Sequence, residues 1–369
     1  MNQLILMGIR GVPAQHGGFE TFAEYLCKYL IDRNWVVIVY CQEDGGGPIY
    51  ESDWLGVKRI HIPVKRKGPL GTIIFDLRSV IHSLRYKGVF LTLGYNTAIF
   101  NVLYRLFGKY NIINMDGIEW KRQKWGRLAK CWFWLNERLG CWFGNHLVAD
   151  HPHIENHLAS RVSRRKITMI PYGGLKIAGA DMSFLDKYNL TKNGYAIVIA
   201  RPEPENSLLE IVSGFSKKSR GFKLVVLGSY SDDNTYHQSV KAAASSDVLF
   251  LGAIYDVAAV SALRFYGLCY VHGHQVGGTN PSLVEALGAS NAILAHDNPF
   301  NQWVAKQGAL YFSGAESISI LFDRIESDDA LVARLRSRSS ENFNLNFQWV
   351  DVLQEYEVLL LRCSIKNSE

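Results

Sequence analysis

The residues best suited to chemistry follow an apolar strand that we expect over Leu268–Val271. The segment His272–Gly288 passes through two adjacent glycines, Gly277 and Gly278, and then begins a helix. Glycines let backbone N–H groups approach a ligand closely, and the positive end of the helix dipole lies at the same point. Glu285, one turn into the helix, adds a carboxylate for ribose hydroxyls. The pattern predicts a nucleotide-diphosphate site, although an ordinary strand–turn–helix would use the same glycines.

The start of this helix supplies further polar groups. Either Asn280 or Ser282 is expected to be the N-cap, with Pro281 in the first helical turn. Thr279 stands directly before them, so its amide joins those of the two glycines as a candidate donor to phosphate oxygens.

Arg201 is a candidate cation for the same diphosphate. It follows the strand expected over Tyr195–Ala200. A guanidinium is always charged and can bind phosphate through two parallel hydrogen bonds. The alternative is a surface ion pair with Glu203 or Glu205.

A second pair of glycines lies near the N-terminus, between the strand expected over Leu4–Gly8 and a helix that begins at Glu20. Gly17 and Gly18 permit close approach of a phosphate or a sugar, with the Glu20 carboxylate in the first turn. The loop lacks the GxGxxG spacing of dinucleotide-binding folds, which argues against a nicotinamide-dependent dehydrogenase. A purely structural turn is equally consistent with these residues.

Asp116 leaves the strand expected over Tyr110–Asn114 and enters a glycine turn. A carboxylate in this position can accept a hydrogen bond from a substrate hydroxyl or act as a base. A helix cap or an Asx-turn is the alternative.

Strands and helices alternate along the chain, which predicts an α/β protein with parallel, doubly wound sheets and ligands at the carboxyl ends of the strands. At 369 residues the chain is long enough for two domains. We expect a first Rossmann-like domain over 1–174, a second over 175–345, and an amphipathic helix within 346–369 that packs back on the first. The expected strands are 4–8, 36–41, 59–64, 89–93, 110–114, 146–150, 167–170, 195–200, 222–228, 248–251, 268–271, 292–295 and 311–312. Helices are expected over 75–86 and 96–107.

Charge is unevenly distributed. Residues 1–174 hold 23 Lys and Arg against 13 Asp and Glu, whereas the rest of the chain holds 17 against 21. A helix expected over Lys121–Trp142 mixes cations with aromatic residues, which favours contact with an anionic membrane surface; a solvated basic face over a packed aromatic one is the alternative. Nucleic acid is not expected, because no module of known type is present. The six cysteines are scattered, which favours reduced thiols in a cytosolic protein. With the basic first half, the expected location is cytoplasmic and peripheral on the inner face of the cell membrane.

Several motifs resemble the family 4 GT-B glycosyltransferases. Gly277–Gly288 is similar to the Glu-x7-Glu donor region of that family, and 199–206 is similar to its Gly-Arg…Glu-Lys-Gly segment. Gly8–Glu20, Asp116–Arg122 and Gly273–Ser282 resemble the bacterial rhamnosyltransferase-like branch, of the β-1,4-rhamnosyltransferase type. The likeness covers nearly the whole chain.

The resemblance implies a GT-B fold in which two Rossmann-like domains face a central cleft, and a retaining hexosyltransferase that uses no metal and no cofactor. It implies transfer of L-rhamnose from dTDP-rhamnose to a lipid-linked saccharide in the synthesis of capsule or O-antigen polysaccharide. Asp116, Arg201 and Glu285 would be the catalytic residues. The implied donor site comprises Arg10, Gly17, Gly18, Arg201, Gly277, Gly278, Thr279, Asn280, Ser282 and Glu285; the implied acceptor site comprises Glu20, Asp116, Glu119, Lys121 and Arg122.

Two positions depart from the family pattern. Gly277 stands where the first glutamate is expected, and Asn206 stands where a phosphate-binding lysine is expected. Backbone amides would then replace the glutamate, and Arg201 would be the main cation unless Arg10 assists. The alternatives are a glycosyltransferase with a UDP-hexose donor, a sugar-nucleotide epimerase of the same fold, and a noncatalytic binder of nucleotide sugars.

Overall fold

The structure is a computed structural model that describes residues 2–15 and 17–366, and it divides into two compact units. Unit 1 comprises residues 1–172 and 349–369, and unit 2 comprises 173–348. The sequence placed the corresponding boundaries after 174 and 345. Residues 367–369 of the expected C-terminal segment, together with Met1 and His16, lie outside the described residues.

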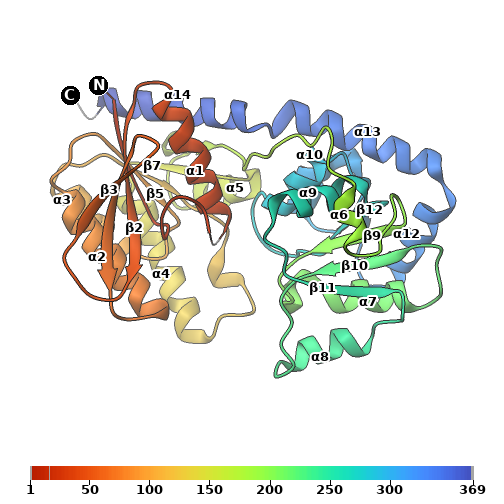
Figure 1. The fold of residues 1–369 in the computed structure, drawn as a ribbon. Helices are drawn as coiled ribbons and strands as arrows, with labels where there is room; N and C mark the ends of the chain where they lie inside the picture. Colours follow the sequence, from red (N-terminus) through yellow and green to blue (C-terminus); the bar gives the residue numbers. More distant parts are fainter. Residues whose placement is uncertain (1, 16, 367–369) are drawn as a thin grey trace. The chain divides into compact units, whose positions relative to one another are not determined.

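Unit 1 is built on a sheet whose described strands follow the order β3-β4-β2-β1-β5-β6-β7-β8 (Figure 1). The strands are β1 (Gln3–Met7), β2 (Val36–Asp44), β3 (Tyr50–Trp54), β4 (Val57–Val64), β5 (Val89–Leu93), β6 (Asn111–Asn114), β7 (His146–Ala149) and β8 (Ile167–Met169). Neighbouring strands are parallel except β3, which pairs antiparallel with β4. The predicted all-parallel arrangement is wrong at this edge. Leu55 and Gly56, both at positive φ, close a tight hairpin there, and the exposed, charged sequence of β3 carries no strand periodicity.

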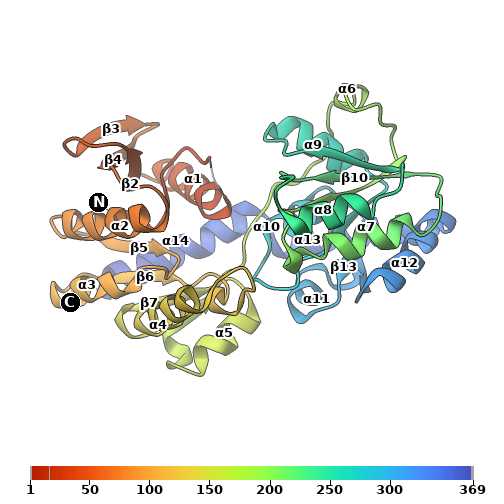
Figure 2. The same cartoon turned by 90° about the horizontal axis from the view of Figure 1, so that it is seen from below.

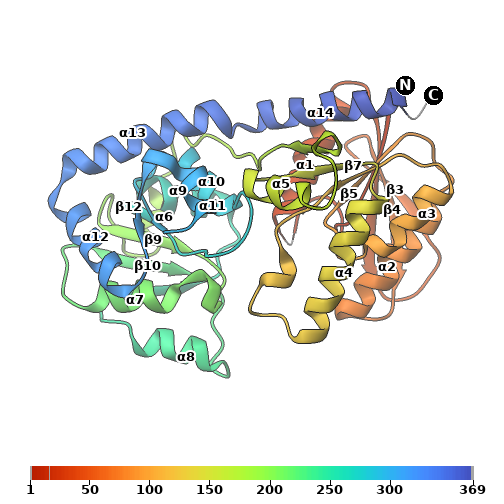
Figure 3. The same ribbon diagram turned by 180° about the vertical axis from the view of Figure 1, so that it is seen from behind.

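Helices cover both faces of this sheet. They are α1 (Gly18–Ile31), α2 (Gly68–Ser83), α3 (Val102–Leu106), α4 (Arg127–Phe143), α5 (Pro152–Ala159) and α14 (Trp349–Lys366). One face carries α1 and α14, whereas α2 and α3 pack on the other, with α4 beside them (Figure 3). Two predicted helices were too long. The helix predicted over 121–142 begins at Arg127, and the apolar segment 96–107 forms the 3-10 turn Ala98–Asn101 before α3.

The C-terminal helix α14 belongs to the core of unit 1. Tyr356 packs against Phe22 of α1 with ring centroids 4.5 Å apart, and Trp349 stacks on Tyr25 at 5.0 Å. The buried Tyr356 hydroxyl also accepts a hydrogen bond from Asn114 Nδ2 at 2.8 Å, at the end of β6. Aromatic burial of this size anchors the helix to the sheet.

Unit 2 contains a parallel sheet with the order β11-β10-β9-β12-β13-β14 in the described residues (Figure 1). Its strands are β9 (Tyr195–Ile199), β10 (Lys223–Leu227), β11 (Val248–Gly252), β12 (Cys269–His272), β13 (Ile293–His296) and β14 (Ala309–Phe312). Its helices are α6 (Ser183–Asp186), α7 (Leu208–Ser216), α8 (Thr235–Ala242), α9 (Val257–Tyr266), α10 (Pro281–Gly288), α11 (Pro299–Ala305), α12 (Ala315–Ser327) and α13 (Asp329–Asn346). Helices α7 and α12 cover one face, and α9, α10 and α11 cover the other (Figure 2). The strands predicted here are confirmed to within a few residues.

Each sheet has one point at which its strand order reverses. In unit 1 β1 lies between β2 and β5, and in unit 2 β9 lies between β10 and β12. The connections leave such a strand in opposite directions, so a crevice opens at its carboxyl end. The predicted glycine-rich segment of unit 1 follows β1 itself, and that of unit 2 follows β12, the strand next to β9.

Gly8 lets the chain after β1 lie directly against the end of β5, and its replacement tests this geometry. Its φ is +87°, and a Cβ would overlap the Leu93 carbonyl oxygen at the end of β5. We expect Gly8→Ala to lower the free energy of unfolding by about 2–4 kcal/mol through strain and overlap. Urea denaturation measures the change. Gly179→Ala is the control, because nothing lies within 4 Å of its Cβ position; equal stability of the two variants would contradict the assignment.

Candidate functional site

In unit 2, two loops at the carboxyl ends of β9 and β12 are tied together. The Gln275 amide N–H donates to the Glu205 carbonyl at 2.9 Å, and the Gln275 side chain donates to Ser207 Oγ at 2.9 Å. The Ser207 hydroxyl donates to the Gly273 carbonyl at 2.8 Å. A Cβ on Gly273 would overlap the carbonyl oxygen of Asn206. The structure therefore brings the two segments that the sequence predicts for one diphosphate to the same corner of the sheet.

Arg201 lies at this corner with an exposed side chain. Its carbonyl accepts hydrogen bonds from the Glu203 N–H at 2.7 Å and from Asn206 Nδ2 at 2.8 Å. Asn206 is buried and its amide turns toward the backbone. Asn206, which stands where the similar family has a lysine, therefore has a structural role. The guanidinium of Arg201 is available to an anion.

Helix α10 begins as the sequence predicts, and its cap is Asn280. Asn280 Oδ1 accepts hydrogen bonds from the Ser282 N–H at 3.1 Å and from Ser282 Oγ at 2.9 Å, with Pro281 as the first helical residue. Thr279 is buried before the cap. Gly277 has φ +142°, a conformation that side-chain-bearing residues rarely adopt. A glutamate at 277 would therefore be strained.

Glu285 has a partner that the sequence did not reveal. Its Oε2 forms an ion pair with Arg264 NH2 at 2.5 Å; the Arg264 side chain is buried, whereas that of Glu285 is 38 % exposed. The buried guanidinium fixes the orientation of the carboxylate at the edge of the site. Arg264 gave no signal because it is a single cation within the apolar segment that forms α9.

His272 is fully buried at the end of β12. Its ring stacks on His274 with centroids 4.4 Å apart, and neither ring nitrogen has a hydrogen-bond partner among the described residues. Burial, reinforced by His274 and His296, lowers the pKa of His272 well below its usual value. The imidazole is therefore neutral near pH 7 and packs as a flat ring beneath the two loops.

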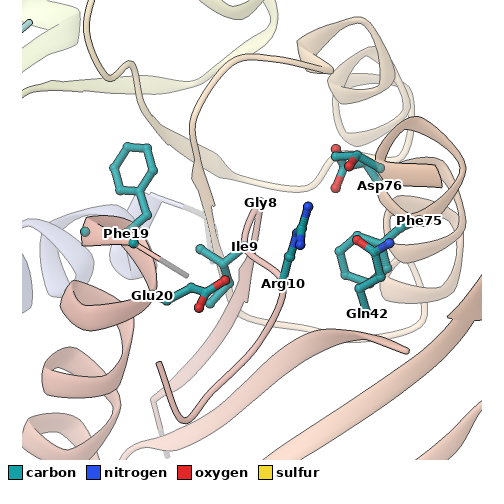
Figure 4. A pocket seen from close by; sticks show the side chains of 11 residues that line it. Gly8, Ile9, Arg10, Phe19, Glu20, Gln42, Phe75 and Asp76 are labelled. Carbon is teal, nitrogen blue, oxygen red and sulfur yellow. The ribbon is translucent and has the colours of Figure 1, made fainter. Parts of the chain in front are cut away.

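Unit 1 contains a pocket of about 280 Å³ at the carboxyl end of β1. Figure 4 shows the side chains that line it. It is lined by Gly8, Ile9, Arg10, Gly17, Gly18, Phe19, Glu20, Gln42, Thr72, Phe75 and Asp76. A neighbouring cavity of about 390 Å³ shares Arg10, Glu20 and Gln42 with it. Three residues predicted for the donor and one predicted for the acceptor therefore meet in unit 1, and the remaining donor residues lie in unit 2.

Two carboxylates of α1 hold the loop that precedes the helix. Glu20 Oε2 accepts a hydrogen bond from the Gln15 N–H at 2.8 Å, and Glu24 Oε2 accepts one from the Ala14 N–H at 2.8 Å. Glu20 is buried. Its carboxylate shapes the wall of the pocket by fixing the loop, a role that sequence reasoning did not anticipate.

Asp76 was missed entirely. It projects from α2 on the opposite side of Arg10 from Glu20 (Figure 4), and its Oδ2 accepts a hydrogen bond from Thr97 Oγ1 at 2.8 Å. Burial raises the pKa of Asp76 to about 7, against the opposing effect of the Thr97 hydroxyl. The sequence predicts Asp76 in the first turn of a helix that starts at Phe75, where an acidic residue is ordinary. In the structure α2 begins earlier, at Gly68, and Asp76 lies within it.

Asp116 follows β6 at φ +51° and does not line the pocket of Figure 4. Its N–H donates to Asn114 Oδ1 at 3.1 Å, so the Asx-turn weighed for Asp116 is formed by Asn114 instead. Burial and the nearby Glu119 carboxylate raise the pKa of Asp116 to about 6. A partly buried carboxyl of this kind can accept a hydrogen bond from a hydroxyl.

The other predicted acceptor residues hold the segment after β6. Glu119 accepts hydrogen bonds from Arg122 NH1 at 2.8 Å and from Trp125 Nε1 at 3.0 Å. The Lys121 ammonium lies 5.6 Å from the centre of the Trp120 ring. These local contacts hold residues 119–125 in a 3-10 turn and the bends after it, so α4 begins only at Arg127.

Residues 2–15 and 17–366 contain no group of three or more His, Cys, Asp or Glu side chains arranged to hold a metal ion. None of their helices is long and apolar enough to cross a membrane.

A family model described as a domain of unknown function, DUF1972, matches residues 1–175. No curated protein matches the chain. Solved structures do match over nearly its full length. A sucrose-phosphate synthase from Thermosynechococcus elongatus has a TM-score of 0.79 at 15% identity and covers 98% of this chain and 99% of its own.

Anabaena HepE in complex with UDP and glucose has a TM-score of 0.77 at 13% identity, with 98% and 99% of the two chains covered. A glycosyltransferase from Rickettsia africae has a TM-score of 0.70 at 14% identity, with 98% of each chain covered. The protein therefore has the GT-B fold, with two Rossmann-like sheets.

The ion pair of Glu285 and Arg264 can be tested by a double-mutant cycle. Glu285→Ala leaves a buried guanidinium without its carboxylate, so we expect a loss of about 1–2 kcal/mol in the free energy of unfolding. This is less than for a fully buried pair, because Glu285 is partly solvated. Denaturation of Glu285→Ala, Arg264→Met and the double variant gives the coupling energy. Glu341→Ala, which breaks an exposed pair with Arg338, is the control; equal losses would contradict a special role.

The raised pKa of Asp76 predicts a pH-dependent stability. The folded protein binds this proton more tightly than the unfolded chain, so stability falls as pH rises from about 4 to about 7. Asp76→Asn removes the ionisation. We expect it to raise the free energy of unfolding at pH 8 by about 2 kcal/mol and to change it little at pH 4. Urea denaturation at pH 4 and pH 8 measures the free energy of unfolding, and the exposed Asp233→Asn is the control. If Asp76→Asn changes the free energy of unfolding equally at the two pH values, the assignment is refuted.

Proposed function

We propose that the protein is a glycosyltransferase that moves a sugar from a nucleoside diphosphate to a hydroxyl of a saccharide acceptor. The observation that carries the proposal is the corner of unit 2. There an exposed Arg201 guanidinium, the Gly277–Thr279 backbone and the start of α10 are supported by the tied loops at β9 and β12. A guanidinium and backbone amides at a helix start form an anion site suited to a diphosphate.

The chemistry of transfer matches this arrangement. The bond between the anomeric carbon and the diphosphate oxygen breaks, and the acceptor oxygen bonds to that carbon. Negative charge grows on the departing nucleoside diphosphate. Preorganised cations and amides stabilise this charge most in the transition state. In the proposed retaining reaction, a phosphate oxygen of the leaving group takes the proton of the acceptor hydroxyl, so no protein base is required.

Glu285 would bind a ribose hydroxyl, since Arg264 orients its carboxylate and part of its surface remains exposed. The pocket of unit 1 would receive the acceptor, because the carboxylates of Asp76 and Glu20 that line it are suited to sugar hydroxyls. Asp116, one strand beyond β5, would contact the acceptor from the end of β6.

For the substrates we propose dTDP-rhamnose as donor and a lipid-linked saccharide as acceptor, in the synthesis of a surface polysaccharide. This choice rests on the resemblance of Gly8–Glu20, Asp116–Arg122 and Gly273–Ser282 to the rhamnosyltransferase-like branch. UDP-glucose is the second candidate donor, favoured by the likeness to HepE, whose structure contains UDP and glucose.

The test compares nucleotide binding and turnover. Calorimetry with dTDP-rhamnose and UDP-glucose identifies the donor, and release of the nucleoside diphosphate with synthetic lipid-linked saccharides measures transfer. We expect Arg201→Ala to lower kcat/KM roughly tenfold to 150-fold, the equivalent of a charge-assisted hydrogen bond of about 1.5–3 kcal/mol.

Arg334→Ala, an exposed arginine on α13, is the matched control and should leave the rate unchanged. Donor binding without turnover on any acceptor would instead favour a noncatalytic binder, to which Gly277 and Asn206 also point. Failure of both donors to bind would refute the proposal.

A further inference from the structure

Helix α4 has one face that is firmly attached to unit 1. Asn136 Oδ1 accepts a hydrogen bond from the Ile99 N–H at 2.9 Å. Glu137 pairs with Arg161 at 2.8 Å and with His157 at 3.0 Å. Gly140 packs closely against Met115, where a Cβ would lie 3.3 Å from the methionine methyl group. The positions of these residues fix the inward side of the helix.

The opposite face carries large apolar side chains in contact with solvent. Leu128 is 90 % exposed, Trp142 is 58 % exposed and Trp134 is 41 % exposed; Leu135 and Cys131 lie between them on the same side. A surface helix normally buries such residues. Two tryptophans and two leucines on the outer face of a 17-residue helix therefore require a partner.

Charge in the same segment is sorted by sign. The two carboxylates, Glu119 and Glu137, point inward, with side chains 13 % and 2 % exposed. The cations of the segment are more accessible: Lys121, Lys124 and Arg127 are exposed, and Lys130 and Arg138 are partly exposed. The Arg138 guanidinium lies 3.5 Å from the centre of the exposed Trp134 ring. The outer surface thus combines apolar rings with positive charge and presents no carboxylate of its own.

The surface continues beyond the C-terminal end of α4. The Lys166 ammonium donates a hydrogen bond to the Cys141 carbonyl at 2.5 Å. Burial lowers the pKa of Lys166, and the positive charge of Arg105 adds to this effect. The residues next to Arg105, Leu106 and Phe107, are 74 % and 61 % exposed. Because α3 and α4 are in contact, apolar side chains between cations extend from α4 to the end of α3.

We propose that this outer face of α4, with residues 105–107, docks on an anionic lipid bilayer. Tryptophan and leucine enter the headgroup region while arginine and lysine contact the lipid phosphates, as in interfacial helices. The positive charge of the face requires a partner with negative charge. The projecting apolar side chains require a partner with an apolar interior that they can enter, as a bilayer has. A nucleic acid would satisfy only the first condition. The inference is independent of the proposed function, because it concerns binding to vesicles in the absence of any sugar substrate.

Cys131 provides a direct reporter of docking. It is exposed on the proposed face, whereas the other five cysteines are buried. The full chain labelled at Cys131 with a polarity-sensitive fluorophore is mixed with vesicles of phosphatidylcholine alone or with about one third phosphatidylglycerol. We expect the emission to move to shorter wavelength only with the anionic vesicles. The shift should decrease as salt is raised from about 0.1 to 1 M, because the Debye length falls from about 10 Å to 3 Å.

Variants separate penetration from charge, and unlabelled protein in vesicle co-sedimentation measures both. We expect Trp134→Ala with Trp142→Ala to weaken partitioning at least about tenfold, since each tryptophan loses its apolar contact. Arg127→Glu with Lys130→Glu should weaken it by at least about tenfold as well, given roughly fivefold per cation. The matched controls lie in unit 2: Tyr255→Ala, which is 84 % exposed, and Arg324→Glu with Arg334→Glu. They should leave partitioning unchanged.

Three results would overturn the proposal. The first is equal binding to neutral and anionic vesicles, and the second is no binding to either. The third is a dimer in analytical ultracentrifugation that dissociates in Trp134→Ala with Trp142→Ala, which would assign the face to a second copy of the chain.

Discussion

The contact between Gly273 and the Asn206 carbonyl is the constraint on which the site of unit 2 depends. Only a residue without a Cβ lets the backbone after β12 lie directly against the loop after β9. The Ser207 and Gln275 hydrogen bonds then close the junction. Since β9 is the strand at which the sheet order reverses, this junction lies where the topology opens a crevice. Backbone approach, rather than side-chain recognition, sets the distance between the guanidinium of Arg201 and the start of α10.

Carboxylates in this protein serve the architecture as well as the chemistry. Glu20 and Glu24 accept hydrogen bonds from the main-chain amides of Gln15 and Ala14 and so shape the loop before α1. Glu119 accepts hydrogen bonds from Arg122 and Trp125 and so holds the segment between β6 and α4. A buried carboxylate is stable when donors saturate it. A loop held in this way has less conformational entropy to lose when a ligand binds, which favours binding.

The sequence was sufficient for the fold class and for the parallel strands, because apolar strands and glycine turns alternate regularly along it. It missed the antiparallel edge strand β3, whose exposed, charged residues carry no strand pattern. It narrowed the cap of α10 to Asn280 or Ser282, because capping chemistry is local, and the structure selects Asn280. It failed for Arg264 and Asp76, because their importance arises from partners distant in the chain, Glu285 and Thr97. Periodicity reports which side of an element is apolar. It does not report which polar group from another element will meet that side.

Asp76 and Asp116 differ from the saturated carboxylates, and the difference has a physical meaning. Asp76 is held by the Thr97 hydroxyl, and Asp116 lies near the like charge of Glu119. Burial raises the pKa of each, to about 7 and about 6 respectively, so each carboxylate costs stability when ionised. Folding alone would favour an amide or an apolar side chain at both positions. A sugar hydroxyl that donated a hydrogen bond to the Asp76 or Asp116 carboxylate would offset the cost of its ionisation. The stability that unit 1 loses without a ligand would then contribute to its affinity for a hydroxyl-rich ligand.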